Sequence, residues 1–550
     1  MRDLLKKRIT EALAEAGVSG VSDIQLEHPS ELQNGDYSTS VALKYAKDMK
    51  MQPRVLAERI VAELGTMDGI AKIEVARTGF INFFLDTSEL VRVVEAARTE
   101  DMWGSNADLA GEQVLIEYTS PNLFKPLHIG NLVGNVIGES ISRLLQFCGA
   151  HVMRINYPSD IGLTVAKGVW GLQKTSGDPN DIAALGTAYR AGNEAYENNP
   201  SAKQEIETIN KKLYERADPV LNALRERGIE TSRRHLDELC RKLGTTFDAE
   251  IFESEAAPVG KEIVERYPNM FPISEGAHVF HGSHTRVFLN SHGLPTYEAK
   301  DLGNFVLKQK RYPAWHRYVV VTGVEQKEYF KVLYEAISTV FPETEGKTMR
   351  HVATGFLTLT TGKMSSRLGN VLTGESLFLD LEAKARERAA ESRADDSSVL
   401  SEEIAVAALK YEILKTGTGR NIVFDRERAL SLEGDSGPYL QYAHARASAI
   451  VDKAHEQGVA VSSATLAPND LSRLLHRFPE VVEYAASEYE PHVLTNYLLQ
   501  LASGFNSWYA QVHILDGSSS APGKVALVEA MQRTLQKGLW ILGIPAPKKM

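Results

Sequence analysis

Residues 116–131 read IEYTSPNLFKPLHIGN, a polar loop between an apolar run at 114–116 and a stretch of helical periodicity. The apolar run predicts a buried parallel strand. A strand, a tight loop and a helix N-terminus together form a natural phosphate site, because the free N–H groups and the helix dipole both favour an anion. Gly130 has no Cβ and lets a flat base approach the backbone, while His128 and Lys125 are placed to contact phosphate oxygens.

The size and composition indicate a multidomain globular protein. At 550 residues the chain has room for three or four domains of about 150 residues each. Cys148 and Cys240 lie far apart and form neither a CxxC pair nor a disulfide framework, so we expect a reducing compartment, the cytoplasm. Residues 1–17 lack the continuous apolar core of a signal peptide. No run approaches the ~20 apolar residues of a membrane span, so we expect no membrane association.

The charge balance is acidic, with a formal net charge of −10. This argues against a protein that holds nucleic acid by bulk positive charge. It leaves room for local basic patches, because total charge does not say where the charges lie.

Short apolar runs alternate with helical patterns in the middle of the chain, which predicts an α/β fold with a doubly wound, Rossmann-like parallel sheet. We expect this catalytic domain at 111–400, with strands at 113–118, 151–156, 317–322 and 350–359 and a helical insert at about 164–245. The flanking parts are expected to be a small α/β N-terminal domain at 1–86, a helical linker at 87–110 and an all-α C-terminal domain at 401–550.

A second loop, Gly362-Lys363-Met364-Ser365-Ser366-Arg367, follows the strand-like run at 355–359. Such a loop can bring positive charge to a phosphate group. Preorganised cations there act more in the transition state than in the ground state. Arginine is always charged and can hold phosphate through two hydrogen bonds, so Arg367 can take part in this role.

These two loops resemble the HIGH and KMSKS signatures of class I aminoacyl-tRNA synthetases. The string Ser120-Pro121-Asn122 followed by 125–130 resembles the arginyl-tRNA synthetases in particular. Two positions depart from the family pattern, with Asn131 where His is usual and Ser366 where Lys is usual. Asparagine still donates and accepts hydrogen bonds but carries no charge.

The resemblance implies which residues act on ATP. It assigns catalysis to Lys125, His128, Asn131, Lys363, Ser365 and Arg367. It assigns ATP binding to Pro121, Asn122, Lys125, His128, Gly130, Asn131, Lys363 and Met364.

The resemblance also implies an arginine site. A guanidinium group presents a planar fork of donors that fits a carboxylate. The i, i+4 spacing of Tyr297 and Asp301 puts both on one helical face, where the family binds the guanidinium. The full arginine-binding set implied by the family is Glu117, Ser120, Asn122, Tyr297, Asp301 and Gln326. Tyr329 stands where the family often has His.

The C-terminal part resembles the anticodon-binding domain of the same family, from Asn421 through 434–450 to the terminal Met550. Tyr439 and Tyr442 are expected to stack unpaired bases, and Arg446 to bind phosphate. The alternative is that the aromatic residues are helix core. The N-terminal module resembles the domain that contacts the tRNA elbow.

The implied function is arginine–tRNA ligation. Arginine reacts with ATP, accompanied by Mg²⁺, to give arginyl-adenylate and pyrophosphate, and the arginyl group then passes to tRNA(Arg). We expect no permanently bound cofactor, no dedicated metal site and a monomer. A cysteinyl-type synthetase is one alternative, although it would need a zinc site. The other alternative is a paralogue that kept the fold as an RNA-binding or regulatory protein. The departures from the family signatures at Asn131 and Ser366 are the reason to consider it.

Overall fold

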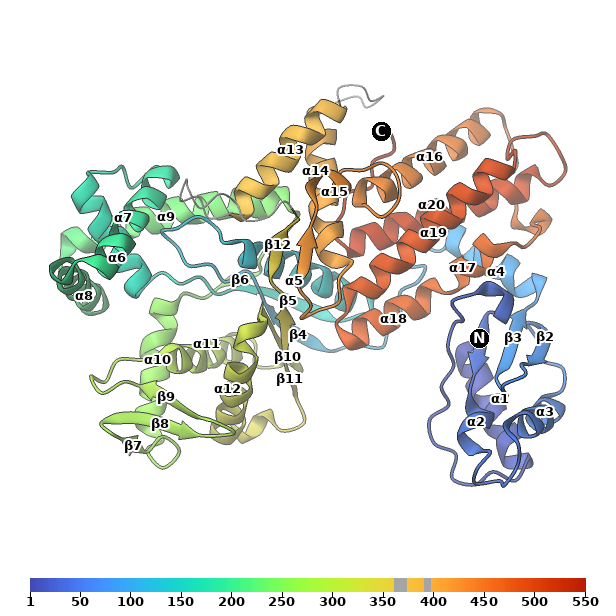
Figure 1. Cartoon of the computed structure of the whole chain (residues 1–550), viewed down its shortest axis with the longest axis horizontal. Helices are drawn as coiled ribbons and strands as arrows, with labels where there is room; N and C mark the ends of the chain where they lie inside the picture. Colours follow the sequence, from blue (N-terminus) through green and yellow to red (C-terminus); the bar gives the residue numbers. More distant parts are fainter. Residues whose placement is uncertain (361–372, 390–396) are drawn as a thin grey trace.

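The computed structural model describes residues 1–360, 373–389 and 397–550 (Figure 1). The central sheet has five parallel strands in the order β11-β10-β4-β5-β6. They are β4 (Gln113–Glu117), β5 (His151–Asn156), β6 (Ala249–Glu250), β10 (Arg317–Gly323) and β11 (Thr348–Thr354). The predicted doubly wound parallel sheet is confirmed. Because β5 and β10 flank β4 on opposite sides, the strand order reverses beside β4, and ligands of such sheets bind at the carboxyl ends of strands at this point.

The side chains of β4 alternate between two cores. Val114 and Ile116 face α5 (Ile129–Phe147) in the larger core, and Leu115 faces the core beneath the helices of the other side. This alternation follows from the two-residue period of a strand. The helices of the other side are α10 (Glu253–Arg266), α11 (Tyr297–Arg311) and α12 (Lys327–Val340). A small antiparallel sheet accompanies them, with β7 (Ile273–Ser274), β8 (Ala277–His281) and β9 (Thr285–Leu289).

A helical insert connects β5 to β6 and extends to the left in Figure 1. Its helices are α6 (Leu163–Thr175), α7 (Ile182–Asn198), α8 (Pro200–Glu215) and α9 (Pro219–Lys242). Helices α8 and α9 have the same type of N-cap. Asn199 or Asp218 accepts hydrogen bonds from free N–H groups of the first turn, and a proline occupies the first helical position. The predicted insert at 164–245 is therefore helical as expected.

The C-terminal part is a helical bundle whose core is continuous with that of α5. Its elements are α13 (Gly374–Ala389), α14 (Ser397–Leu414), α15 (Arg426–Ala429), α16 (Gly437–Glu456), α17 (Asp470–His476), α18 (Phe478–Glu488), α19 (Pro491–Gln511) and α20 (Ala521–Ile541). Helix α4 (Thr87–Thr99) packs against α20 and α17.

Two sequence predictions need correction. The strand predicted at 350–359 is two strands, β11 and β12 (Leu357–Leu359), which belong to different sheets. Residues 421–425, assigned by resemblance to the helical C-terminal part, contain β13 (Ile422–Phe424), which pairs with β12 in parallel. Short strands of this kind are decided by a distant partner, so their own residues carry little signal.

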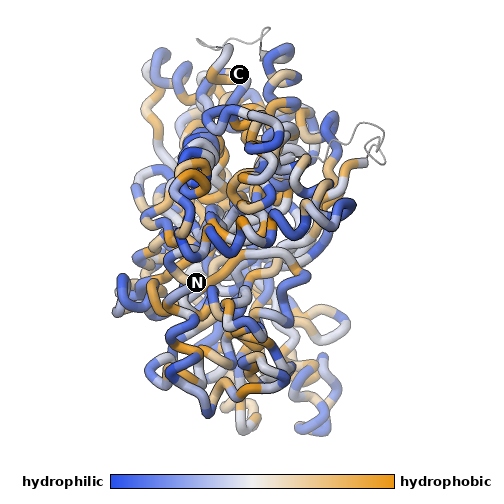
Figure 2. The backbone as a smooth tube through the Cα atoms, turned by 90° about the vertical axis from the view of Figure 1, so that its left-hand side faces the viewer, coloured by the Kyte–Doolittle hydropathy of each residue, from blue (hydrophilic) through white to orange (hydrophobic). Residues whose placement is uncertain are grey.

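The N-terminal module lies beside α17 and α18 (Figure 1). It has an antiparallel sheet in the order β1-β3-β2 with helices on one side and its own core. Its elements are α1 (Arg2–Glu15), β1 (Tyr37–Thr39), α2 (Val41–Tyr45), α3 (Pro53–Leu64), β2 (Ile70–Val75) and β3 (Ile81–Leu85). Hydrophobic and hydrophilic stretches alternate along the backbone (Figure 2). Among the described helices, none is both long and apolar enough to cross a membrane.

Candidate functional site

The signature loop after β4 has a strained backbone. Thr119, Ser120 and Phe124 have φ angles of 75°, 40° and 67°, values that residues with a Cβ rarely adopt. Such strain persists only where surrounding contacts impose it, and it is common at functional sites. The residues of the loop are therefore held in one arrangement by their neighbours.

Helices α5 and α9 supply those contacts. The Asn131 side chain donates to the Thr119 carbonyl at 2.7 Å, and Asn135 donates to the Thr119 hydroxyl at 3.0 Å. On the insert side, the Phe124 N–H donates to the Ser232 hydroxyl at 3.1 Å. The residue at the departure from the HIGH pattern, Asn131, thus ties the loop to the start of α5.

His128 caps helix α5. Its Nδ1 accepts a hydrogen bond from the Gly130 N–H at 3.1 Å, so in the neutral ring the proton is on Nε2, which can donate to an anion. Burial and the charge of Lys125 lower the pKa of His128, and Glu325 opposes them. The Lys125 ammonium lies 5.8 Å from the ring centre of Tyr189 in the insert, and burial lowers its pKa. His128 thus lies at the N-terminus of α5, and Lys125 lies in the loop before it.

The second predicted loop, with Lys363, Met364, Ser365 and Arg367, lies outside the described residues. The chain on either side of it can be placed. Before the gap, the Thr360 N–H donates to the Phe424 carbonyl at 3.1 Å. After it, Thr373 pairs with His128 and the Gly374 N–H donates to the Leu127 carbonyl at 2.9 Å. The residues that directly follow the gap, Thr373 and Gly374, therefore lie against the signature loop.

Glu117, the last residue of β4, forms a buried ion pair with Lys308 of α11. The same oxygen, Oε2, accepts from the Asn304 side chain at 2.9 Å. The other oxygen, Oε1, accepts from the Ser120 hydroxyl at 3.5 Å. Burial lowers the pKa of Lys308, and the adjoining carboxylate limits that shift. Since an unpaired charge is costly to bury, the two charges stabilise each other.

Asp301 lies two turns before Lys308 on the same face of α11 and accepts from the Tyr329 hydroxyl at 2.5 Å. Burial, and then the charge of Glu117, raise the pKa of Asp301 to about 8, although the Tyr329 hydrogen bond opposes the shift. A cation beside this carboxyl group would favour loss of its proton.

The remaining predicted arginine-binding residues come from the segments that surround Glu117 and Asp301. Tyr297 is the first residue of α11 and is 66% exposed. It borders a hollow of about 270 Å³ between the insert and α11. Gln326 ends the turn before α12. Asn122 pairs with Ser159 after β5, and Pro121 before it is buried and accepts from the Ser159 N–H at 2.9 Å. The predicted residues thus converge on the carboxyl ends of β4, β5 and β10.

Sequence reasoning missed several buried polar and charged residues around Glu117 and Asp301. Asn304 and Lys308 follow Asp301 at i+3 and i+7, a spacing that puts all three on one helical face and was available as a signal. The buried pair of Glu253 and Lys300, 2.8 Å apart, gave no such signal, because its members are 47 residues apart.

A second hollow of about 950 Å³ lies in the C-terminal bundle, between α16, the end of α19 and the chain terminus. The Arg446 guanidinium lies 4.6 Å from the ring centre of Tyr442 and 5.3 Å from that of Tyr509, and it donates to the Asn506 side chain at 2.5 Å. The cations that line this hollow include Lys453, Lys548 and Lys549. Tyr439 instead packs against the core.

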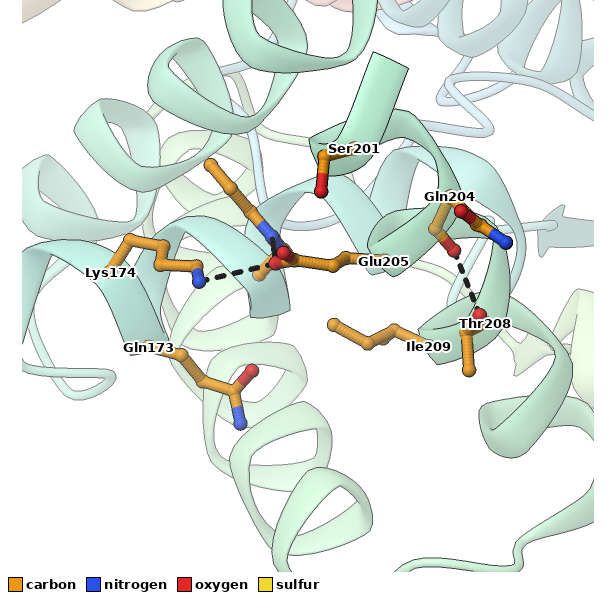
Figure 3. Close-up of a pocket in the computed structure, with 8 residues that line it drawn as sticks. Gln173, Lys174, Ser201, Gln204, Glu205, Thr208 and Ile209 are labelled. Atoms are coloured by element: carbon orange, nitrogen blue, oxygen red, sulfur yellow. Dashed lines mark hydrogen bonds and ion pairs between the residues drawn. The ribbon is translucent and has the colours of Figure 1, made fainter. Parts of the chain in front are cut away.

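A third hollow, of about 490 Å³, lies between α6 and α8 of the insert (Figure 3). Its charged groups satisfy one another, because Glu205 accepts from Trp170 at 2.8 Å and pairs with Lys174 at 3.1 Å. Within the described ranges, no group of three His, Cys, Asp or Glu side chains could hold a metal ion.

Three protein-family models match successive parts of the chain. The model described as "tRNA synthetases class I (R), catalytic domain" matches residues 94–426. The models for the arginyl tRNA synthetase N-terminal domain and the DALR anticodon binding domain match residues 3–85 and 440–550.

Individual relatives agree along their full length. The chain is 30% identical to the arginine–tRNA ligase of Treponema pallidum, with 99% of this chain and 98% of the relative covered. It is 28% identical to that of Pyrococcus abyssi, with 99% of each covered. The arginyl-tRNA synthetase structure from Thermus thermophilus superposes with a TM-score of 0.81 at 26% identity and covers 100% of both chains. On the strength of these matches, the chain belongs to the arginyl-tRNA synthetase family of class I aminoacyl-tRNA synthetases.

Proposed function

We propose that this chain is an arginine–tRNA ligase whose reaction takes place at the carboxyl ends of β4 and β10. The carboxylate of arginine attacks the α-phosphate of ATP and displaces pyrophosphate, and the terminal adenosine of tRNA(Arg) then attacks the activated carbonyl. The observation that carries the proposal is the placement of the Glu117 and Asp301 acids beside a strained loop that ends at the N-terminus of α5. A separate nucleophile is not needed, because positioning and charge stabilisation suffice.

ATP is assigned to the signature loop. Gly130 and the free N–H groups of the first turn of α5 offer donors to phosphate, and His128 Nε2–H and Lys125 add two more. Pro121, Asn122 and Asn131 border the same loop. We assign Lys363, Met364, Ser365 and Arg367 to the triphosphate by the family resemblance, and the pairing of Thr373 with His128 supports this assignment. Mg²⁺ belongs to this reaction as part of the ATP substrate.

Arginine is assigned to the acidic pocket. Asp301 binds the guanidinium group, with Tyr297 beside it, and Glu117 receives the α-ammonium group. Ser120, Asn122 and Gln326 orient the amino-acid end. The pocket should reject amino acids that lack a guanidinium group, because such a substrate would leave a buried acid without a partner. The cysteinyl alternative is not supported, since the acids of this pocket suit a cation.

The RNA is assigned to the C-terminal hollow. Tyr442 and Tyr509 offer ring faces to unpaired bases, and Arg446 with the surrounding lysines offers charge to phosphates. This basic hollow supports tRNA binding despite the acidic net charge. Tyr439 is assigned a supporting role in the helix core. We propose a monomer that acts in the cytoplasm, and the free buried cysteines fit such a reducing compartment.

The experiment is an aminoacylation assay with arginine, ATP, Mg²⁺ and tRNA(Arg), together with pyrophosphate exchange with and without tRNA. We expect charging with arginine. Asp301→Asn should raise the KM for arginine by about two orders of magnitude, because a charge-assisted contact is lost, and should leave the KM for ATP unchanged. Asp218→Asn, which keeps the cap of α9, is the matched control. Exchange driven by cysteine, or no exchange with any amino acid, would refute the assignment.

A further inference from the structure

Lys300 of α11 is a buried cation in the wall of the hollow of about 270 Å³ between the insert and α11. Its side chain is 8% exposed, and its ammonium group donates to Glu253 Oε2, at the start of α10, at 2.8 Å. The ring centres of Tyr297 and Tyr214 lie 5.2 Å and 5.9 Å from the same nitrogen. One ammonium group therefore contacts side chains of α8, α10 and α11.

The charge of Lys300 is maintained by its neighbours. Burial lowers the pKa of Lys300, but Glu253 and then Tyr214 raise it, and the net shift is upward. Lys300 therefore stays an ammonium group at neutral pH, and such a group attracts the face of an aromatic ring. Glu253 is buried as well, so separation of the pair would leave two buried charges without partners. The ammonium group is thus held at a fixed place.

Tyr297 is the exposed member of this cluster. An aromatic side chain with 66% of its surface exposed can adopt more than one rotamer unless a neighbour favours one of them. Lys300 lies three residues farther along α11, on the same helical face as Tyr297. Asp301 follows directly. The contact with the fixed ammonium group therefore favours one orientation of the ring, close to the Asp301 carboxyl group.

We propose that Lys300 is a positioning residue that holds the Tyr297 ring in the orientation that contacts the guanidinium group of arginine. The inference rests on the proposed function, because it takes arginine as the substrate and Tyr297 as one of its contacts. Lys300 itself does not touch the substrate. Glu253 balances its charge, so the ammonium group can line a pocket for a cationic amino acid without repelling it. Through Tyr214, the insert contributes to the same arrangement.

The test is a double-mutant cycle with Lys300→Met, Tyr297→Ala and the double variant. The KM for arginine, the KM for ATP and kcat are measured in aminoacylation. Lys300→Met should raise the KM for arginine about tenfold, the range for a desolvated contact between a cation and a ring, and leave the KM for ATP unchanged. In the Tyr297→Ala background, Lys300→Met should add nothing, because the ring through which it acts is gone.

Lys300→Arg is the rescue variant. It keeps a cation beside both the Tyr297 ring and the Glu253 carboxylate, so the KM for arginine should stay within about twofold of the wild-type value. Lys300→Met leaves Glu253 without a cation, and thermal unfolding of each variant therefore shows whether it folds. If Lys300→Met does not fold, Glu253→Gln combined with Lys300→Met takes its place in the cycle, since this pair of substitutions leaves no unpaired buried charge.

The matched control is Lys167→Met, which removes another buried lysine that contacts a tyrosine ring. The Lys167 ammonium lies 4.2 Å from the ring centre of Tyr196 and donates to the Asn193 side chain at 2.9 Å, and all three residues belong to the insert. This substitution should leave the KM for arginine unchanged. Additive effects in the cycle, an equal rise in the KM for ATP, or no rescue by arginine would overturn the inference. Failure of the wild type to charge arginine would instead refute the proposed function.

Discussion

At the scale of single residues, the substrate pocket is governed by the pairing of acids with their neighbours. The family resemblance implied a role for Asp301, and the structure adds a contact with the hydroxyl of Tyr329 at 2.5 Å. Tyrosine at this position, where the family often has histidine, can donate one hydrogen bond without bringing charge. The Tyr329 hydrogen bond lowers the pKa of Asp301, but burial and the charge of Glu117 outweigh it.

The raised pKa of Asp301, about 8, predicts a pH dependence for arginine binding. The guanidinium group pairs with the ionised acid, so protons compete with arginine below this pKa. The KM for arginine should fall as pH rises from 6 to about 8 and then level off, with about a tenfold change per pH unit on the acidic side. Steady-state aminoacylation across this range, with saturating ATP, measures it. In Asp301→Asn the slope should be absent, and a slope that persists would assign the titration to another group.

At the scale of elements, the site depends on contacts that the insert makes with the signature loop. Asn135 of α5 donates to the Thr119 hydroxyl and accepts from the Thr245 hydroxyl at 2.9 Å, just beyond the end of α9. Gly228 of α9 lies against the Phe124 ring, where a Cβ would come within 2.3 Å of it. The insert therefore serves as one wall of the loop as well as a connection between two strands.

Asn135→Ala should loosen the signature loop. Thr119 and Thr245 would each lose a buried partner, at a cost of about 1–3 kcal/mol in the free energy of unfolding. Misplacement of the loop should also lower kcat by about one order of magnitude. Denaturant unfolding and single-turnover adenylate formation check the two effects. Asn222→Ala, an exposed amide on α9, is the comparison, and an equal loss of kcat in both variants would contradict this role.

At the scale of the whole molecule, the N-terminal module is docked on the C-terminal bundle through buried polar contacts. Arg473 of α17 binds Asp36 at 2.6 Å and also the Leu32 carbonyl at 2.6 Å. The Tyr37 hydroxyl lies 2.8 Å from His476 and also contacts Glu480. Because these groups are buried on docking, the module has a defined position relative to the C-terminal bundle.

Arg473→Met tests this docking. It leaves the buried Asp36 without its cation, which should lower the free energy of unfolding by about 3 kcal/mol. The KM for tRNA should rise, because the module loses its fixed position, whereas the KM values for arginine and ATP should not change. Arg533→Met is the control. It removes an ion pair with Asp101, whose side chain is 97% exposed, and it should have little effect on stability. Equal effects of both substitutions on the KM for tRNA would rule out the docking as their cause.

The sequence by itself determined the parallel sheet, the helical insert, the signature loop and the face of α11 that carries Asp301. These features depend on residues close together in the chain, through the period of a helix or strand and the chemistry of a turn. Only the tertiary structure decided that Lys308 pairs with Glu117, 191 positions away, that β12 pairs with β13, and that Arg473 holds the N-terminal module. Such pairings arise when packing removes water from particular charges, and local patterns do not specify which charges meet.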